Sequence, residues 1–173
     1  MPMQFWKVIL LDPGRDWNRF VKEKAVFIGQ FGPESLNEAD KYTCKEDLEQ
    51  FLPEGAASQL WEFTSEIAVG DLVIAATTKS ILGVGKVTGT YTYEPIYDPK
   101  DECYHKSHIR RVSWVELTPN LAPAKGDPVF KPLPKGFESL NNQIQVVEMS
   151  EEDWDTVTDK YPKIKEASKK LTA

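Results

Sequence analysis

Glycines and tyrosines alternate with other residues along the segment 81–93. If this segment is a strand, its odd-numbered residues share one face, because successive side chains point to opposite sides. That face carries Gly83, Gly85 and Gly89 and then Tyr91 and Tyr93. Glycine inside a strand usually marks a bulge or a close approach by another group. The pattern indicates either a helix packed on the glycines or room for a flat ligand beside the two tyrosines.

Aromatic residues are numerous, with five Trp, six Tyr and eight Phe. Some have the spacing of a buried helix face, such as Trp17 and Phe20, and are expected in the core. Others fall near the ends of elements, and together they offer enough flat surface to enclose a nucleobase. These are Trp6, Phe31, Trp61, Tyr91, Tyr93 and Tyr97.

Two regions are locally basic inside an acidic protein. The net charge is −6, which argues against bulk electrostatic coating of nucleic acid. Residues 34–66 hold nine acids and two lysines, whereas residues 72–93 and 103–115 contain no acid. Ordinary surface variation explains this as well as function does. The functional interpretation is that these regions contact phosphates, through Lys79, Lys86, His108, Arg110 and Arg111.

Motifs for catalysis are missing from the sequence. There is no phosphate loop, no nucleophile elbow and no H-E-x-x-H, and the glycines of 81–89 do not fit the dinucleotide fingerprint. Cys103, His105 and His108 supply three potential metal ligands, whereas a structural zinc site normally has four. We therefore expect no catalytic residue, no metal and no cofactor.

The order of predicted elements indicates an α+β fold. A strand at 5–11, a helix at 15–24 and a strand at 25–29 come first, followed by helices at 45–52 and 56–67. Strands at 72–76, 81–93, 108–117 and 143–148 follow, and a helix begins after Ser150, a plausible N-cap. The helix at 56–67 should pack through Leu60, Phe63 and Ile67. Long neighbouring strands predict a mixed, curved sheet with barrel-like closure.

The length of 173 residues suits one domain, which we place at residues 1–162. Residues 163–173 are lysine-rich and are expected to form a tail or a linker to another domain. The two cysteines, the lack of a signal-peptide pattern and the absence of any membrane-length apolar run predict a cytoplasmic protein without membrane contacts.

Six segments occur in an order that resembles a known family. They are FWK at 5–7, VFIG at 26–29, ASQLWEF at 57–63, VGDLV at 69–73, ILGVGKVTG at 81–89 followed by Tyr91 and Tyr93, and RRVSW at 110–114. The series resembles the EVE-like domains of the PUA-like superfamily. It is most similar to those at the N-terminus of McrB-type GTPases of modification-dependent restriction systems, and it covers about residues 4–117.

This resemblance implies a small curved barrel with flanking helices that binds a modified base turned out of a duplex or taken from a single strand. The related YTH domains hold N6-methyladenine in an aromatic cage, and other members are linked to modified cytosines. The expected ligand is therefore DNA with one modified base. N6-methyladenine is the first candidate, and 5-methylcytosine is the second. A C-terminal AAA+ GTPase domain and a nuclease subunit are the implied partners. The alternatives are an RNA-binding PUA-like domain, and an enzyme or protein-interaction domain.

The resemblance also bears on individual residues. Members often carry an aromatic residue after the second-strand Ile-Gly, where this sequence has Gln30, and Gln30 could hydrogen-bond a base edge. The expected base-binding residues are Trp6, Gln30, Phe31, Trp61, Tyr91 and Tyr93.

Overall fold

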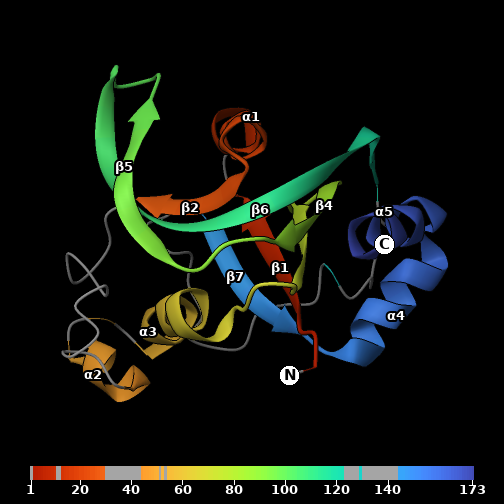
Figure 1. The fold of residues 1–173 in the computed structure, drawn as a ribbon, viewed down its shortest axis with the longest axis horizontal. Coiled ribbons are helices and arrows are strands. Elements are labelled where there is room, and N and C mark those ends of the chain that lie inside the picture. The colour runs from red at the N-terminus through yellow and green to blue at the C-terminus, as the bar shows by residue number, and fades with distance from the viewer. Residues whose placement is uncertain are drawn as a thin grey trace.

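A mixed seven-stranded sheet organises the computed structural model, which describes residues 2–10, 13–29, 44–50, 52, 54–122, 129 and 144–173 (Figure 1). The strands are β1 (Phe5–Leu10), β2 (Ala25–Gly29), β3 (Leu72–Ala76), β4 (Ile81–Val87), β5 (Thr92–Asp98), β6 (Cys103–Leu121) and β7 (Ile144–Met149). The helices are α1 (Pro13–Glu23), α2 (Lys45–Glu49), α3 (Glu54–Trp61), α4 (Glu151–Lys160) and α5 (Pro162–Thr172), with a π-helical turn η1 (Glu62–Glu66) after α3. The expected α+β class is confirmed.

Strand β6 is 19 residues long and joins two parts of the sheet. Its residues 107–109 pair with both β2 and β5, so these two strands lie on opposite edges of β6. The other end of β6 pairs with β4, and the order continues through β3 and β1 to β7. Among the strands of the described residues, β1 and β3 are the one parallel pair, and the other pairs are antiparallel. Strands β1 and β3 are nearly continuously apolar and buried, as expected for central strands covered on both faces.

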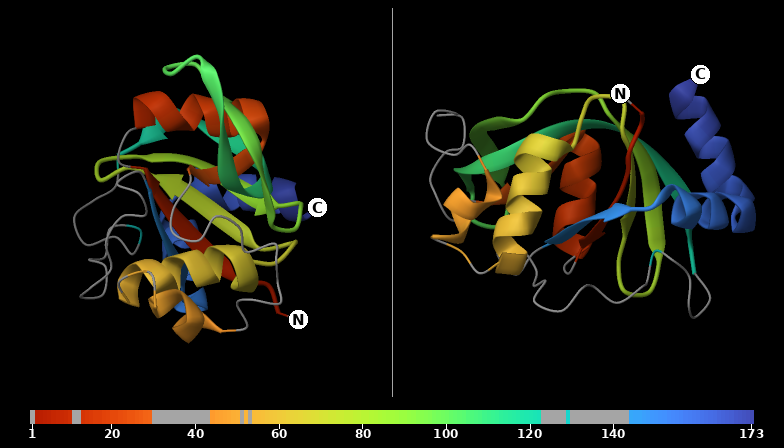
Figure 2. Two further views of the ribbon diagram at one scale, coloured as in Figure 1. Left: turned by 90° about the vertical axis from the view of Figure 1, so that its left-hand side faces the viewer. Right: turned by 90° about the horizontal axis from the view of Figure 1, so that it is seen from below.

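Helices cover both faces of the sheet. Figures 1 and 2 show α1 and α3 on opposite sides, with α4 and α5 at one flank. Helix α1 buries Trp17 and Phe20, and the Phe20 ring meets Phe27 of β2 edge to face. On the α3 side, Leu60, Phe63 and Ile67 are all buried in the same core cluster, which confirms their predicted packing. A second cluster lies beneath α4 and α5.

The sheet is open in the part of the chain that the structure describes. Strands β2 and β7 end the pairing order, and no ladder joins them there. The predicted barrel-like closure is therefore not confirmed. Strand β6 instead pairs with β2 and β5 near its beginning and with β4 near its end, and it bends markedly along its length (Figure 1).

The predicted long strand at 81–93 is two strands. β4 ends at Val87, opposite Val112, and β5 begins at Thr92, opposite Ile109. The four residues 88–91 therefore lie opposite only Arg110 and Arg111 of β6, and the two extra residues form a bulge. The Thr88 N–H donates to the Arg111 carbonyl oxygen (2.9 Å) inside it. A bulge bends the strand pair, and this one lies where β6 changes from pairing with β4 to pairing with β5.

The lysine-rich end is a helix rather than an irregular tail. Ser150 caps α4 as predicted, accepting a hydrogen bond from the Asp153 N–H (3.1 Å). Helix α5 then begins at Pro162, a favoured first residue of a helix. It buries Ile164 and Ala167 against β4 and β6, and its lysines lie on the outside. Two buried side chains, Ile164 and Ala167, are therefore enough to attach this weakly apolar helix to the sheet.

The glycines of β4 make room for tryptophans. A Cβ on Gly83 would lie 2.7 Å from Cη2 of Trp17, and one on Gly85 would lie 2.7 Å from Cε3 of Trp114. The two tryptophan rings pack edge to face, 5.1 Å apart. Of the two interpretations of the glycine pattern, close packing by α1 is therefore the one seen at Gly83.

We expect Gly83→Ala to destabilise the protein by about 1–3 kcal/mol, the usual cost of overpacking a core. The added methyl group would also lie 2.9 Å from the Val115 carbonyl oxygen, which the backbone holds in place. Denaturant unfolding measures the change. Combining Gly83→Ala with Trp17→Phe should cost less than the sum of the single changes, because the shorter ring gives way. Strict additivity would contradict this contact.

Candidate functional site

Two tyrosines and a histidine form a compact group on the α3-facing side of β5 and β6. Tyr93 pairs directly with His108 across the strands, and their rings lie 4.8 Å apart. The Tyr91 hydroxyl and His108 Nδ1 share a hydrogen bond of 2.6 Å, with nearly parallel rings. His108 is fully buried, whereas both tyrosines keep part of their surface open. The imidazole therefore fixes the orientation of two partly exposed aromatic rings.

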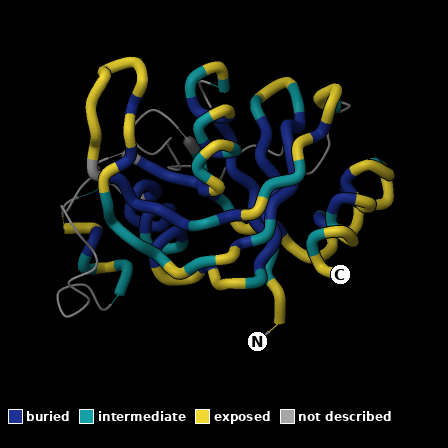
Figure 3. Tube along the Cα trace, turned by 45° about the horizontal axis from the view of Figure 1, so that its top comes forward, coloured by how far each residue is buried: buried dark blue, intermediate teal, exposed yellow. Residues whose placement is uncertain are grey.

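More tyrosines continue this face toward the end of the hairpin. Because side chains alternate and the β5–β6 register is regular, Tyr97 and Tyr104 share the face of Tyr93 and His108. Their rings pack edge to face at 5.3 Å, and they are 39% and 69% exposed. We call Tyr91, Tyr93, Tyr97 and Tyr104 the tyrosine strip. Figure 3 shows the hairpin end standing out of the body as an exposed segment.

Arg110 is buried and supports the fold. Its Nε and Nη2 atoms donate to the carbonyl oxygens of Phe63 and Thr64, both at 2.8 Å. A helix end leaves such carbonyls without intrahelical partners and favours a cation beside them. Burial lowers the pKa of Arg110 to about 10, although Asp71 and Tyr91 act in the opposite direction. Arg110 thus remains charged at neutral pH. Its guanidinium contacts η1 and is not exposed on the surface where phosphates would bind.

Arg111 points to the other side of the sheet. Its Nη1 donates to the Glu23 carbonyl oxygen (2.9 Å), and its Nη2 pairs with Glu94 Oε1 (2.8 Å). Arg110 and Arg111, both expected to contact phosphates, therefore lie on opposite faces of the sheet, because neighbouring residues of a strand face opposite ways. Lys79 is exposed in the turn before β4, and Lys86 lies near the far end of that strand. The strand between Ile81 and Lys86 alone spans roughly 17 Å.

Trp6 lies in the core rather than in an open pocket. It is 0% exposed, and its Nε1 donates to Asp71 Oδ2 (3.0 Å). Asp71 also accepts hydrogen bonds from the backbone N–H groups of Gln4 (3.0 Å) and Ala68 (2.9 Å). The expected role of Trp6 as a pocket wall is inconsistent with this burial, since β1 is covered on both faces.

The other expected base-binding residues are placed only in part. Trp61 ends α3, half-buried against the main core cluster that also includes Tyr91 at its edge. Gln30 and Phe31 lie outside the described residues. Strand β2 ends at Gly29, paired with Ser107, one position from His108. Strand β6 therefore separates the end of β2 from the tyrosines of β5.

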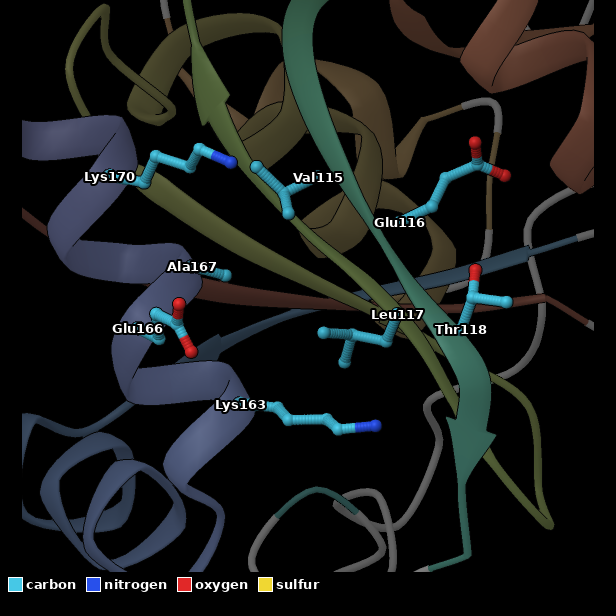
Figure 4. Close-up of a pocket in the computed structure, with 8 residues that line it drawn as sticks. All are labelled: Val115, Glu116, Leu117, Thr118, Lys163, Glu166, Ala167 and Lys170. Atoms are coloured by element: carbon cyan, nitrogen blue, oxygen red, sulfur yellow. The ribbon is translucent and has the colours of Figure 1, made fainter.

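A shallow hollow of about 230 Å³ lies elsewhere, between β6 and α5 (Figure 4). No residue predicted to bind a base or a phosphate lines it. Its lining consists of Val115, Glu116, Leu117, Thr118, Lys163, Glu166, Ala167 and Lys170.

Residues 6–126 match the family model of a domain of unknown function, DUF8426. The chain belongs to the DUF8426 family. The matched range includes β1 to β6, and with them the whole tyrosine strip and Arg110. No curated protein matches the chain. Among the described residues, none of the helices has the length and apolar character needed to span a membrane.

Glu62 of η1 is a half-buried carboxyl that sequence patterns did not mark. Burial, together with the charges of Glu66 and Glu148, raises its pKa from 4.5 to about 7. Its Oε2 is buried without a hydrogen-bond partner among the described residues. Burial also raises the pKa of Glu148, with Glu66 and Asp71 contributing. The folded state therefore favours the protonated form of Glu62.

Loss of Arg110 should affect stability far more than loss of Arg111. Arg110→Ala leaves two buried carbonyls unsatisfied, and we expect a cost of about 2–4 kcal/mol. Arg111→Ala removes a partly exposed ion pair and should cost about 0–1 kcal/mol. Denaturant unfolding compares the two. Similar losses for both variants would contradict the supporting role assigned to Arg110.

Stability should fall as pH rises from 4.5 to about 7, the interval between the unfolded and folded pKa values of Glu62. In this interval the unfolded state releases a proton that the folded state retains. Glu62→Gln should remove this fall, worth on the order of 1 kcal/mol after solvent screening, and Glu66→Gln should reduce it. Unfolding curves across the interval measure the effect. An unchanged pH profile in Glu62→Gln would refute it.

Proposed function

We propose that this protein binds nucleic acid by stacking one unpaired base on Tyr91 and Tyr93 of the tyrosine strip. The supporting observation is the arrangement of Tyr91 and Tyr93, two partly open rings held in place by the buried His108. Rings fixed in advance lose little side-chain entropy when a ligand stacks on them. Tyr97 and Tyr104 extend the aromatic surface and offer flat contacts to neighbouring bases.

The ligand proposed is a modified base in DNA, as the specificity element of a modification-dependent restriction system. Taking a base out of a duplex costs a few kcal/mol, and stacking on aromatic rings returns roughly 1–3 kcal/mol per base. A buried methyl group adds about 0.8 kcal/mol. An aromatic surface that also buries this methyl group favours a methylated base over its unmodified form. By analogy with the related YTH domains, N6-methyladenine is the first candidate, and 5-methylcytosine is the second.

Electrostatic attraction plays a small part in this proposal. The protein carries a net charge of −6, Arg110 is hydrogen-bonded to η1, and Arg111 is paired with Glu94. His108 was also expected to contact phosphates, but it is buried, so the remaining predicted phosphate contacts are Lys79, Lys86 and the partly exposed Arg111. Binding that depends on stacking rather than on many phosphate contacts should have a shallow salt dependence. The role proposed is recognition, with chemistry carried out by a partner domain or subunit.

Tyr93→Ala should weaken binding to an oligonucleotide with one modified base by about 5- to 150-fold, the equivalent of 1–3 kcal/mol of stacking. Tyr93→Phe, which keeps the ring, is the matched control and should bind nearly as well as the unaltered protein. Tyr91→Ala should reduce affinity and also release His108 from its hydrogen bond. Fluorescence anisotropy measures all three.

The oligonucleotides should differ in one base only: adenine, N6-methyladenine, cytosine or 5-methylcytosine, in DNA and in RNA. Tighter binding of one modified DNA base supports the proposal, and tighter binding of RNA would favour the alternative of an RNA-binding domain. If discrimination persists in folded Tyr91→Ala and Tyr93→Ala proteins, the base does not bind on these tyrosines.

A further inference from the structure

The end of the β5–β6 hairpin gathers four metal-binding side chains on the face opposite the tyrosine strip. Asp98 and Cys103 are direct partners across the strands, and His105 lies two residues beyond Cys103 on the same face. Asp101 belongs to the turn that joins the strands. His108, the third ligand considered from sequence, faces the other way with Tyr93. The structure thus separates His108 from the cluster and adds two carboxylates to it.

The distances are close to those around a bound metal ion. His105 Nε2 lies 3.0 Å from Asp101 Oδ2 and 3.4 Å from Cys103 Sγ. Donor atoms of Asp98, Asp101 and His105 all lie within 4.8 Å of one another. In a tetrahedral zinc site, bonds of 2.0–2.3 Å place neighbouring donors about 3.3–3.7 Å apart. Cys103 Sγ approaches His105 Nε2 but lies outside this group of three, so the Cys103 side chain must rotate toward the carboxylates before all four donors reach a common ion.

We propose that Asp98, Asp101, Cys103 and His105 bind a divalent transition-metal ion, with Zn²⁺ as the first choice. A thiolate and an imidazole select a borderline or soft ion over Mg²⁺ or Ca²⁺, which prefer oxygen alone. Cys103 is a free and exposed thiol, so metal can reach it. Binding replaces the thiol proton with the metal and releases that proton to solvent.

The surroundings hold Asp98 ready as a ligand. The Lys100 N–H donates to its Oδ1 (2.9 Å) and holds the carboxylate against the turn of the hairpin. Arg19 and Arg15 of α1 place positive charge near the Asp98 carboxylate. The same two arginines repel a cation, so the negative ligands must compensate for them.

A metal at this position would join both strands of the hairpin and their turn. Arg19 already ties the hairpin to α1, since its Nη2 donates to the Tyr97 carbonyl oxygen (3.1 Å). Metal binding should therefore reduce local opening of residues 97–105, including the Tyr97–Tyr104 pair on the other face. Slower amide hydrogen exchange in this hairpin on addition of Zn²⁺ would report that effect.

The test is a titration with Co²⁺, whose spectrum reports both coordination geometry and sulfur ligation, followed by Zn²⁺ competition and calorimetry. The chain has only two cysteines and two histidines, so each variant can be interpreted clearly. Cys103→Ser should abolish the sulfur-to-cobalt band. His105→Asn and Asp101→Asn should each weaken binding by at least about tenfold, since losing even an outer-shell partner costs about 10–100-fold. Cys44→Ser, a change at the other thiol before α2, is the matched control and should bind normally.

One Co²⁺ per chain, a sulfur-to-cobalt band and the expected losses would support the site. A spectrum without that band, affinity unchanged in His105→Asn, or an equal loss in Cys44→Ser would overturn it. Circular dichroism of each variant without metal confirms that the fold is intact, because the side chains replaced at Asp101, Cys103 and His105 are exposed.

Discussion

The hydrogen bonds from Arg110 to the carbonyl oxygens of Phe63 and Thr64 connect strand β6 to the η1 turn that follows α3. They fix η1, and with it α3, against the point where β6 changes partners. Asp71 lies close enough to raise the pKa of the buried guanidinium, and it binds the N–H groups of Gln4 and Ala68 as well. A buried charge held this way is costly to disturb. The tyrosine strip is therefore attached to a rigid base, because His108 is two residues from Arg110.

Sequence patterns located most elements because their apolar periodicity agreed with their burial. They failed where tertiary contacts decided the outcome. The bulge at 88–91 depends on how β6 pairs with two strands in succession, which no local pattern contains. Helix α5 has only Ile164 and Ala167 as buried residues, too few to distinguish it from a solvated tail. The alternation of side chains along a strand, by contrast, suffices to put Arg110 and Arg111 on opposite faces, as their partners in the structure show.

The candidate site was predictable only in its centre. Tyr91, Tyr93 and His108 were singled out from composition and strand pattern, and the fold brings them together. Trp6 was indistinguishable in sequence from a pocket residue, since an indole on a first strand fits a core equally well. Tyr104, Asp98 and Asp101 were missed because their positions depend on the hairpin register. The Asp-Pro-Lys-Asp run at 98–101 was the available turn signal.

The family match ends at residue 126, but the folded unit does not. Strand β7 covers the outer edge of β1 over six residues, and α4 and α5 cover the apolar surface of β3 and β4. A fragment cut at the boundary of sequence similarity would expose a hydrophobic central strand along its hydrogen-bonding edge, a template for aggregation. The region that the family model matches is thus shorter than the packed structure. Any chain built on this sheet needs a covering strand at that edge, whatever sequence supplies it.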